Sequence, residues 1–537
     1  MNYKISLLSL QSFFSVRNFS KCVVFFLTLL NYSCAEAQAP SIVNTPVHDT
    51  LLDYDRFPWL LPEYNMIQFY SKDALDQFMK SWELTKEKKM SIVHLGDSHL
   101  QSDFFPGRMR KNLQAIHGDG GRGIMFPYSA AKTYSSNEYT TTHKGEWTYG
   151  KSLILPPKLP LGVSGMTVKT IDSTASFTFT FKNPVPANYS KLKIFCKKDS
   201  ISYDLIVECG GKTIDVNIDT ITGDSLPYYE IDLPLFTTEI IFHVKRNHKY
   251  ETELVFYGMS LETPENTGII YHNCGVGGAK YESILYEQLF SAQLPTLNPD
   301  LVIIDFGTND YLYDDSLKAK EEANIIKVIE MVRAAAPNAS IILTTTMDMY
   351  FKSDHVTSGQ TFSDLIKKIA KKEKCGVWDW YWVAGGWNVM PLFQSHHLAN
   401  PDGVHNSPSG YRLKGNLFSA AMANTIKWME ENPTKDSLVF QMDSLKQSQL
   451  VIKLREDSDS TTCPRIKVVY KVHKKETLAM ISKKFHVTPA EIRKWNNMQS
   501  NYLKTGKVLW IYCDPKYKPK PPAKKKPAAK PPAAKPK

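Results

Sequence analysis

The segment Met90–Gln101 most constrains the fold, because it has the pattern of a buried strand that turns sharply into a helix. Its first half is largely apolar, and Gly96 permits a tight turn. Apolar residues then recur at helical spacing from about Phe105 to Ile116. A serine at such a turn, here Ser98, presents its hydroxyl at the carboxyl end of a sheet beside unpaired backbone N–H groups. The segment therefore predicts an α/β fold with a reactive serine at the edge of a sheet.

Strands and helices alternate again after residue 266. The expected strands are Ile269–Cys274, Leu301–Phe306, Ile341–Thr346 and Val377–Tyr381, and the expected helices are Tyr281–Gln293, Leu317–Ala335, Phe362–Lys372 and Ser409–Glu430. This alternation indicates a doubly wound parallel sheet with helices on both faces. We expect residues 39–129 and 266–431 to form the two segments of this α/β domain.

A serine hydroxyl is a weak nucleophile unless a base removes its proton and a carboxylate orients that base. Asp402 and His405 stand three residues apart on a predicted loop and can both reach one serine. Asn309 follows another predicted strand, where its side-chain amide can donate to an oxyanion. His94 and His99, which lie close to Ser98 in the sequence, are expected to be structural.

Four ordered blocks carry a resemblance to a known family. They are Gly96-Asp97-Ser98, Asn273-Cys274-Gly275-Val276-Gly277-Gly278, Gly307-Thr308-Asn309-Asp310 and Asp402-Gly403-Val404-His405. The blocks resemble those of the SGNH/GDSL hydrolase superfamily. The resemblance implies Ser98 as nucleophile, His405 as general base and Asp402 as its orienter. It also implies an oxyanion hole of the Ser98 N–H, the Gly278 N–H and the Asn309 side chain. Gly275 and Gly277 compete with Gly278, and register favours Gly278.

Residues 130–265 have a different pattern, that of short alternating runs separated by turn residues. Seven strands are expected, at Ser176–Phe181, Lys191–Cys196, Tyr203–Val207, Thr213–Ile218, Tyr229–Leu233, Ile240–Val244 and Leu254–Tyr257. Strands at this spacing predict an inserted β-sandwich. The insertion is similar to that of the peptidoglycan O-acetylesterases of the superfamily, where it resembles a carbohydrate-binding module. Both sugar binding and a purely packing role stay open.

The carboxyl-terminal part divides into three segments. Residues 432–462 are expected to be a polar linker, and residues 463–513 resemble a LysM domain. The resemblance rests on Tyr470-x-Val472, Glu476-Thr477-Leu478, Ile481, Phe485-x-Val487-Thr488, Ile492, Trp495-Asn496, Leu503, Gly506 and Leu509-x-Ile511. It implies a small βααβ fold that binds N-acetylglucosamine polymers. Cys463 and Cys513 bracket this domain and are expected to form a disulfide.

The net charge bears on whether the chain binds nucleic acid, and the amino-terminal segment bears on whether it is exported. The formal charge is +11, but nine lysines lie in residues 516–537, part of a Lys/Pro/Ala tail (514–537) expected to be disordered. The rest of the chain is nearly neutral, so nucleic acid is set aside as a partner. Residues 1–37 read as a signal peptide with no transmembrane anchor, and lipidation of Cys34 is a second interpretation. Export to the periplasm or cell envelope of a bacterium follows.

These features predict a secreted serine esterase, without cofactor or metal, that removes O-acetyl groups from a cell-wall glycan. Peptidoglycan, or another N-acetylglucosamine-containing glycan bound through LysM, is the preferred substrate. An acetylated xylan-type polysaccharide and a non-catalytic wall-binding protein are the alternatives. A metallophosphoesterase is the rival chemistry, because Asp97-Ser98-His99 has the Asp-x-His form of such sites and Asp103 follows. Its downstream ligand runs are absent from the sequence.

Overall fold

A computed structural model describes residues 54–217, 227–442, 444–459, 466–474, 476–496, 498 and 500–513. The predicted signal peptide and the Lys/Pro/Ala tail lie outside these residues, and so does Cys463. Export, the disordered tail and the Cys463–Cys513 disulfide therefore stay predictions.

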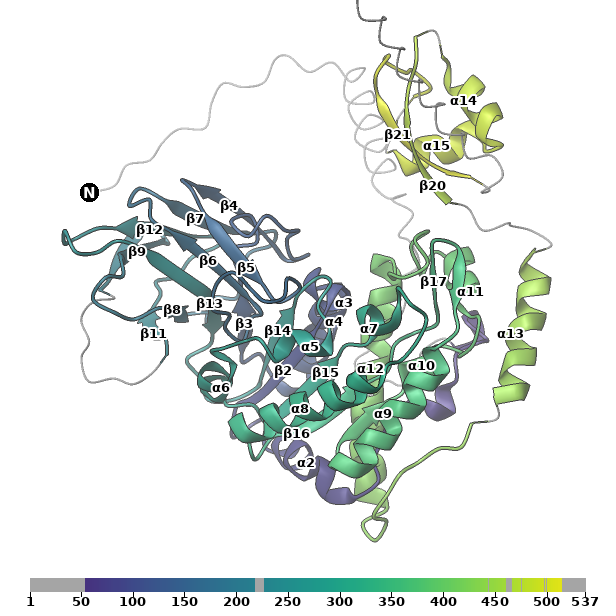
Figure 1. The fold of residues 1–537 in the computed structure, drawn as a ribbon, viewed down its shortest axis with the longest axis horizontal. Helices are drawn as coiled ribbons and strands as arrows, with labels where there is room; N and C mark the ends of the chain where they lie inside the picture. The colour runs from purple at the N-terminus through teal and green to yellow at the C-terminus, as the bar shows by residue number, and fades with distance from the viewer. Residues whose placement is uncertain are drawn as a thin grey trace, which may run out of the picture. The chain divides into compact units, whose positions relative to one another are not determined.

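A six-stranded sheet forms the centre of the α/β domain (Figure 1). Its strands, in spatial order, are β1 (Ile67–Gln68), β19 (Gly376–Trp378), β16 (Ser340–Thr344), β15 (Leu301–Asp305), β2 (Met90–Gly96) and β14 (Ile269–Gly275). All neighbouring strands are parallel except β1 and β19. The predicted parallel sheet is confirmed, with one antiparallel edge strand added. The strands are apolar and fully buried, as expected for a sheet covered on both faces.

Two groups of helices flank this sheet. In the first group α4 (Phe104–His117) packs against α12 (Pro408–Glu431), and in the second α8 (Ala319–Ala335) packs against α9 (Gly359–Glu373) and α5 (Tyr281–Ile284). In Figure 1, α8 and α9 lie in front of the sheet, whereas α4 and α12 lie behind it. Shorter helices follow the strands or close the loops; they are α2 (Asp76–Glu83), α3 (Ser98–Gln101), α6 (Phe290–Gln293), α7 (Thr308–Tyr311), α10 (Trp380–Val383) and α11 (Met390–Ser395). Within the described ranges, no helix combines the length and apolar character needed to cross a bilayer.

The helix predicted over Tyr281–Gln293 is wrong, because this segment forms the separate short helices α5 and α6. Hydrogen bonds to another part of the chain interrupt it. The N–H of Leu289 donates to the carbonyl of Leu161 at 3.0 Å, and the N–H of Leu161 donates to Gln288 Oε1 at 3.0 Å. The first bond takes the Leu289 N–H out of the helical pattern, and the second holds the Gln288 side chain against the same loop.

The inserted region forms two antiparallel sheets (Figure 1). One has the order β10 (Lys212–Val216), β9 (Asp204–Cys209), β12 (Glu239–Lys245), β7 (Ser176–Phe181) and β4 (Tyr139–Lys144). The other has the order β11 (Tyr229–Asp232), β8 (Lys191–Cys196), β13 (Leu254–Glu262), β6 (Met166–Thr170) and β5 (Thr148–Lys151). The sheets contact each other through aromatic rings, since Phe177 of the first lies 4.9 Å from Phe256 of the second, centroid to centroid.

Strand β13 joins this inserted region to the α/β domain. It is nine residues long and fully buried, and it pairs with β8 and β6. Its carboxyl-terminal half also pairs with β3 (Gly121–Met125), which in turn contacts β14 of the central sheet. The sequence predicted only the first four residues of β13 and none of β4, β5 and β6. Those three strands carry threonine, lysine and glycine, which weaken the apolar alternation.

The carboxyl-terminal domain has the predicted βααβ order. It consists of β20 (Ile466–Lys471), α14 (Leu478–Phe485), α15 (Pro489–Trp495) and β21 (Val508–Cys513), with the two strands antiparallel. Apolar residues from all four elements form its core, among them Leu478, Phe485, Ile492 and Ile511. The preceding helix α13 (Ser444–Asp459) lies in the predicted linker and contacts α11 of the α/β domain.

Candidate active site

Ser98 is the first residue of α3, directly after the turn that follows β2. The turn is tight: a Cβ on Gly96 would lie 2.4 Å from Leu100 Cδ1 and 2.6 Å from the Asp305 carbonyl oxygen. Only glycine fits there without displacing the backbone of β15. Asp97 caps the helix, since its Oδ1 accepts a hydrogen bond from the His99 N–H at 2.9 Å. The local sequence thus holds the Ser98 hydroxyl at the carboxyl end of the sheet.

The structure brings Ser98, His405 and Asp402 together. Ser98 Oγ lies 2.8 Å from His405 Nε2, and His405 Nδ1 lies 2.9 Å from Asp402 Oδ2. The other carboxylate oxygen of Asp402 accepts hydrogen bonds from the N–H groups of Val404 and His405, both at 3.0 Å. With Nδ1 protonated toward Asp402, Nε2 offers a lone pair to the serine proton. Residues 307 positions apart in the sequence therefore meet in the geometry that general-base catalysis requires.

Electrostatics at the pair match this arrangement. Burial lowers the pKa of His405, but the hydrogen bond and the negative charge of Asp402 outweigh burial and raise it above the ordinary value. Burial raises the pKa of Asp402, yet the hydrogen bonds and charge of His405 and the Val404 N–H lower it below the ordinary value. Asp402 is therefore ionised at neutral pH, and it stabilises the imidazolium that forms when His405 accepts a proton.

Two backbone N–H groups lie near the serine without an acceptor among the described residues, those of Ser98 and Gly278. The competing glycines are both engaged. The N–H of Gly275 donates to Asn273 Oδ1 at 3.1 Å, and the N–H of Gly277 donates to Gln101 Oε1 at 2.7 Å. Gly278 has a φ of +85°, which a residue with a side chain rarely adopts. Among the three glycines, Gly278 alone presents a free donor.

Asn309 lies on α7, and its side-chain amide is already held. It donates to Asp97 Oδ2 at 3.1 Å and to the Ala279 carbonyl at 3.0 Å. Gly307 starts this turn with a φ of +126°, and a Cβ there would lie 2.4 Å from Phe362 Cζ. The amide thus sits beside the residue that precedes Ser98, and donation to an oxyanion requires it to share one of these bonds.

Asp97, which the sequence reasoning did not select as a site residue, lies between the serine turn and Asn309. It is buried, and burial raises its pKa to about 7, although the His99 N–H lowers it. Its two oxygens accept from His99 and Asn309, so it links the serine turn to the amide. The sequence did offer a sign of this, because Asp97 directly precedes Ser98 and has no Lys or Arg near it in the sequence.

The neighbouring histidines occupy separate places. The ring of His99 lies 5.2 Å from that of His405, centroid to centroid, and its Nδ1 is 3.0 Å from the Tyr411 hydroxyl. Burial lowers the pKa of His99 to about 3, so this ring stays neutral and adds no charge beside His405. His94 is fully buried under the turn, 2.7 Å from the Tyr271 hydroxyl. Both positions fit the structural roles predicted for them.

A buried ion pair lies beneath the serine turn. Lys414 Nζ of α12 is 3.0 Å from Asp305 Oδ2 at the end of β15, and His94 Nε2 is 3.5 Å from the same oxygen. Burial alone would raise the pKa of Asp305, but the positive charge of Lys414 and the hydrogen bond from His94 lower it. The pair fixes α12, which follows His405, against the strand that precedes Asn309.

The inserted region contributes two side chains next to the oxyanion donors. A Cβ on Gly277 would lie 2.8 Å from the Tyr134 hydroxyl, and one on Gly278 would lie 3.6 Å from Leu153 Cδ1. Gln101 holds this wall in place, because its Nε2 donates to the Tyr134 carbonyl at 2.9 Å. Tyr134 is 46% exposed and Leu153 42% exposed, so both present surface to a ligand. Nothing in the sequence pattern placed them here.

The carboxylates of the rival metal hypothesis have other partners. Asp103 is buried and pairs with Arg110 at 3.0 Å and with Arg122 at 2.6 Å, which balance its charge. In the described part of the chain, no group of three or more His, Cys, Asp and Glu is placed to hold a metal ion.

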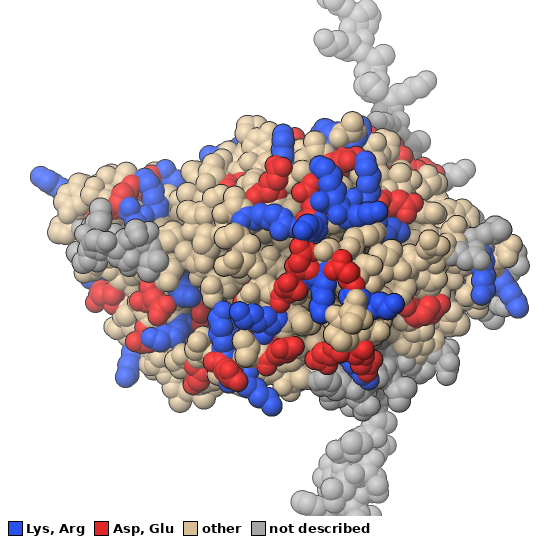
Figure 2. Space-filling model, turned by 90° about the horizontal axis from the view of Figure 1, so that it is seen from below, with Lys and Arg blue, Asp and Glu red and all other residues tan. Residues whose placement is uncertain are grey.

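On the surface, Lys and Arg are interspersed with Asp and Glu over the face shown in Figure 2.

Comparison with known proteins agrees with this arrangement. Residues 261–413 match the GDSL-like lipase/acylhydrolase family, and residues 470–511 match the LysM domain. The first match includes Gly278, Asn309, Asp402 and His405. The chain therefore contains a carboxylic ester hydrolase domain of the GDSL type and a LysM domain. No curated relative matches the sequence.

Among solved structures, a peptidoglycan O-acetylesterase matches with a TM-score of 0.56 and 21% identity, over 67% of this chain and 99% of that chain. At this identity the match shows a shared fold. A family two carbohydrate esterase from Clostridium thermocellum, solved with cellohexaose, matches at 12% identity and a TM-score of 0.26, over 52% of this chain and 99% of that one. The latter score is too low to bear on the fold.

Proposed function

We propose that this chain, which contains a GDSL-type ester hydrolase domain, is a secreted serine esterase that removes O-acetyl groups from peptidoglycan. One observation carries the proposal: Ser98, His405 and Asp402 form a continuous hydrogen-bonded series beside two free backbone N–H groups. A side-chain series of this kind activates an alcohol for attack on an ester carbonyl, and adjacent donors stabilise the resulting oxyanion.

The reaction follows from these positions. His405 Nε2 accepts the Ser98 proton as Oγ attacks the acetyl carbonyl, and Asp402 stabilises the imidazolium. The carbonyl oxygen becomes an oxyanion held by the N–H groups of Ser98 and Gly278 and by the Asn309 amide. The tetrahedral intermediate collapses, the C–O bond to the sugar breaks, and the proton on Nε2 passes to the leaving sugar oxygen. Water then attacks the acetyl-Ser98 ester with His405 again as base, which frees acetate and restores the serine.

The substrate class rests on the parts of the chain around the site. The fold shared with a peptidoglycan O-acetylesterase covers 67% of this chain and 99% of that chain, which supports a similar domain arrangement. The LysM domain supports binding of N-acetylglucosamine-containing glycan. Both features point to the same polymer, the wall glycan, as substrate and anchor. An exported enzyme at the bacterial cell envelope is the location this substrate requires.

The two antiparallel sheets of the inserted region support the proposed β-sandwich. Aromatic rings from both sheets pack between them, as Phe177 and Phe242 of one contact Phe256 of the other. We assign residues 130–265 to this sandwich, between segments 39–129 and 266–431 of the hydrolase domain. Its resemblance to a carbohydrate-binding module, together with Tyr134 and Leu153 at the site, supports a role in holding the glycan.

Acetate release from matched substrates tests the proposal. The full-length protein and Ser98→Ala are compared on a small aryl acetate, on O-acetylated peptidoglycan and on acetylated xylan. We expect Ser98→Ala to lose more than about a thousandfold of the activity on every ester while keeping its thermal transition. Equal turnover by Ser98→Ala would show that the nucleophile is misassigned. Faster deacetylation of xylan than of peptidoglycan would show that peptidoglycan is not the preferred substrate.

A further inference from the structure

A pocket of about 280 Å³ lies on the inserted region beside the candidate active site. We propose that this pocket binds a glycan unit together with the carboxylate of its attached peptide while a neighbouring unit presents its acetyl group to Ser98. The inference rests on the proposed function and specifies the substrate further. The side chains that line the pocket include Lys132, Lys151, Lys158, Trp147, Tyr149 and Ile154.

The pocket is continuous with the wall of the active site. Lys132 precedes Tyr134 by two residues, and Lys151 precedes Leu153 by two residues. Two residues of extended chain span at most about 7 Å. Tyr134 and Leu153 are the side chains that border Gly277 and Gly278. The pocket lining and the side chains that border Gly277 and Gly278 therefore belong to the same two stretches of chain.

The positive charge of the lysines that line the pocket favours binding of an anion. Three lysines line it, and none of them makes an ion pair with a carboxylate in the part of the chain that the structure describes. Like charges gathered around one small cavity repel each other, and a bound anion relieves that repulsion. Lys151 is partly buried, which lowers its pKa, and its Nζ lies 4.9 Å from the Tyr149 ring centroid. Elsewhere in the same sheets, lysines such as Lys191 and Lys197 do pair with acidic residues.

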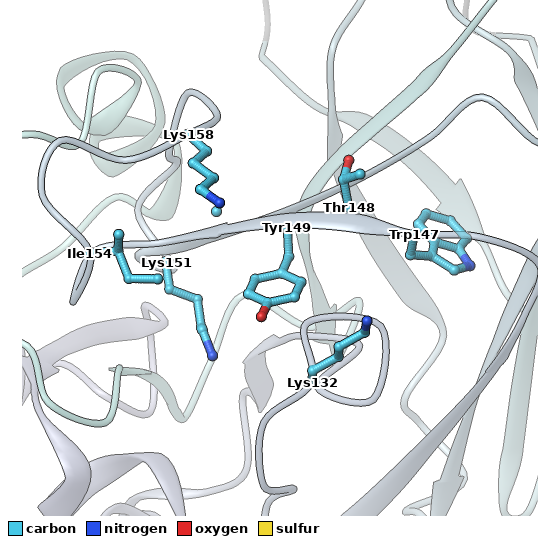
Figure 3. A pocket seen from close by; sticks show the side chains of 8 residues that line it. Lys132, Trp147, Thr148, Tyr149, Lys151, Ile154 and Lys158 are labelled. Carbon is cyan, nitrogen blue, oxygen red and sulfur yellow. The ribbon is translucent and has the colours of Figure 1, made fainter. Parts of the chain in front are cut away.

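The shape and the rings of the pocket suit a sugar. Tyr149 and Lys151 lie on the same side of β5, and Lys132 approaches them from a neighbouring loop (Figure 3). Tyr149 is partly buried, so part of its side chain is accessible from the pocket. An apolar ring beside cationic groups recognises a saccharide that carries a carboxylate, through stacking and charge-assisted hydrogen bonds. Trp147, 8% exposed, closes the end of the pocket.

Paired substrates test this inference on the full-length enzyme. One is an O-acetylated peptidoglycan fragment with free peptide carboxylates, and the other is the same fragment with those carboxylates amidated. We expect the wild type to favour the free carboxylates about tenfold in kcat/KM, with the preference falling as salt rises. The triple variant K132Q/K151Q/K158Q should bring the ratio of the two kcat/KM values close to one. K132R/K151R/K158R, which keeps the charge, should retain the preference.

A lysine outside the pocket provides the control. Lys182 is exposed in the same inserted region, and K182Q should keep the wild-type ratio. Single variants replace the triple variant if it does not fold, and each should lower the ratio. An unchanged ratio in K132Q/K151Q/K158Q would overturn the inference. So would a wild type that cleaves both fragments equally, whereas failure of the wild type on both fragments would reject the peptidoglycan proposal itself.

Discussion

The side-chain amide of Asn309 donates a hydrogen bond to the carboxylate of Asp97 at 3.1 Å, so the residue next to the proposed nucleophile orients a proposed oxyanion donor. Asp97 also accepts from the His99 N–H, which fixes its own orientation. The turn that carries Ser98 and the turn that carries Asn309 come from neighbouring strands, β2 and β15. One buried carboxylate therefore sets the distance between the attacking oxygen and the donor that receives the negative charge.

Asp97→Asn tests this coupling. The new amide keeps one acceptor for the His99 N–H but turns an N–H group toward the Asn309 amide, so two donors face each other. We expect kcat to fall about tenfold to a hundredfold, with KM on a small ester little changed, since loss of a whole oxyanion donor costs about 10² to 10³. Steady-state kinetics on an aryl acetate measure the change. Asn309→Ala and the double variant complete the cycle, and additive losses would show that the two residues act separately.

The pH dependence of kcat/KM follows from His405. Its pKa is raised in the folded protein, and only the neutral ring accepts the Ser98 proton. Activity should therefore be constant at high pH and fall as the pH drops through a value above 6.5. Asp97, with a pKa of about 7, protonates over the same range. Asp402→Asn removes the charge that raises the pKa of His405, so the remaining activity should fall at a lower pH. An acid limb unmoved by Asp402→Asn would contradict the assignment of the base.

Gly278→Ala should impair catalysis through the backbone. At a φ of +85° an alanine is strained, and relief of that strain rotates the N–H group away from the oxyanion. We expect kcat to fall by about a hundredfold. Gly211→Ala is the matched control, because Gly211 has a φ of +72° with nothing within 4 Å of its added Cβ and lies far along the chain from the site. It should lose stability without losing activity, and equal activity losses in the two variants would speak against an oxyanion role for Gly278.

Lys414→Met should destabilise the α/β domain. The substitution leaves the buried carboxylate of Asp305 without its cation, and breaking a buried pair in this way typically costs about 3–5 kcal/mol. Urea denaturation followed by tryptophan fluorescence measures the free energy of unfolding. Lys427→Met is the control on the same helix, because its ion pair with Glu431 is 3.8 Å long and exposed. A change of less than about 0.5 kcal/mol is expected there. Equal effects would mean that Asp305 does not depend on Lys414.

Deletion of residues 463–537 should separate wall binding from chemistry. The deletion removes the LysM domain and the basic tail but leaves every residue of the candidate active site. We expect weaker sedimentation with insoluble peptidoglycan and unchanged kcat/KM on a soluble aryl acetate. The full-length Ser98→Ala variant serves as the control that binds without turnover. If the truncated protein sediments as well as the full chain, the LysM domain is not the anchor.

The order of the α/β elements could be predicted because each central strand is an uninterrupted apolar run that ends at glycine or a polar residue. Ser98 and Asn309 could be named for the same reason, since both follow such runs. Asp402 and His405 could be named from their three-residue spacing on a predicted loop and from the family resemblance of that block. Gly278 could be preferred among three glycines only by register. The structure separates them through hydrogen bonds to Asn273 and Gln101, which no local pattern reveals.

The contacts that cross between the two regions could not be predicted. Tyr134 and Leu153 reach Gly277 and Gly278 from a segment more than a hundred residues away, and neither belongs to a periodic pattern. The break between α5 and α6 has the same origin, since the Leu289 N–H donates to the carbonyl of Leu161 instead of to a carbonyl of its own segment. The contact between Asp97 and Asn309 joins residues 212 positions apart in the sequence, so no local pattern reveals it.

Strand β13 gives the inserted region a fixed geometry. One strand pairs with β6 along its first part, with β8 along most of its length and with β3 along its last part, so the inserted region is joined to the α/β domain by strand pairing rather than by a flexible tether. The proposed glycan site on this region would therefore lie at a fixed distance from Ser98. Exchanging this region for one of another shape should change which sugar along the glycan loses its acetyl group, and removing it would leave β3 without its partner strand β13.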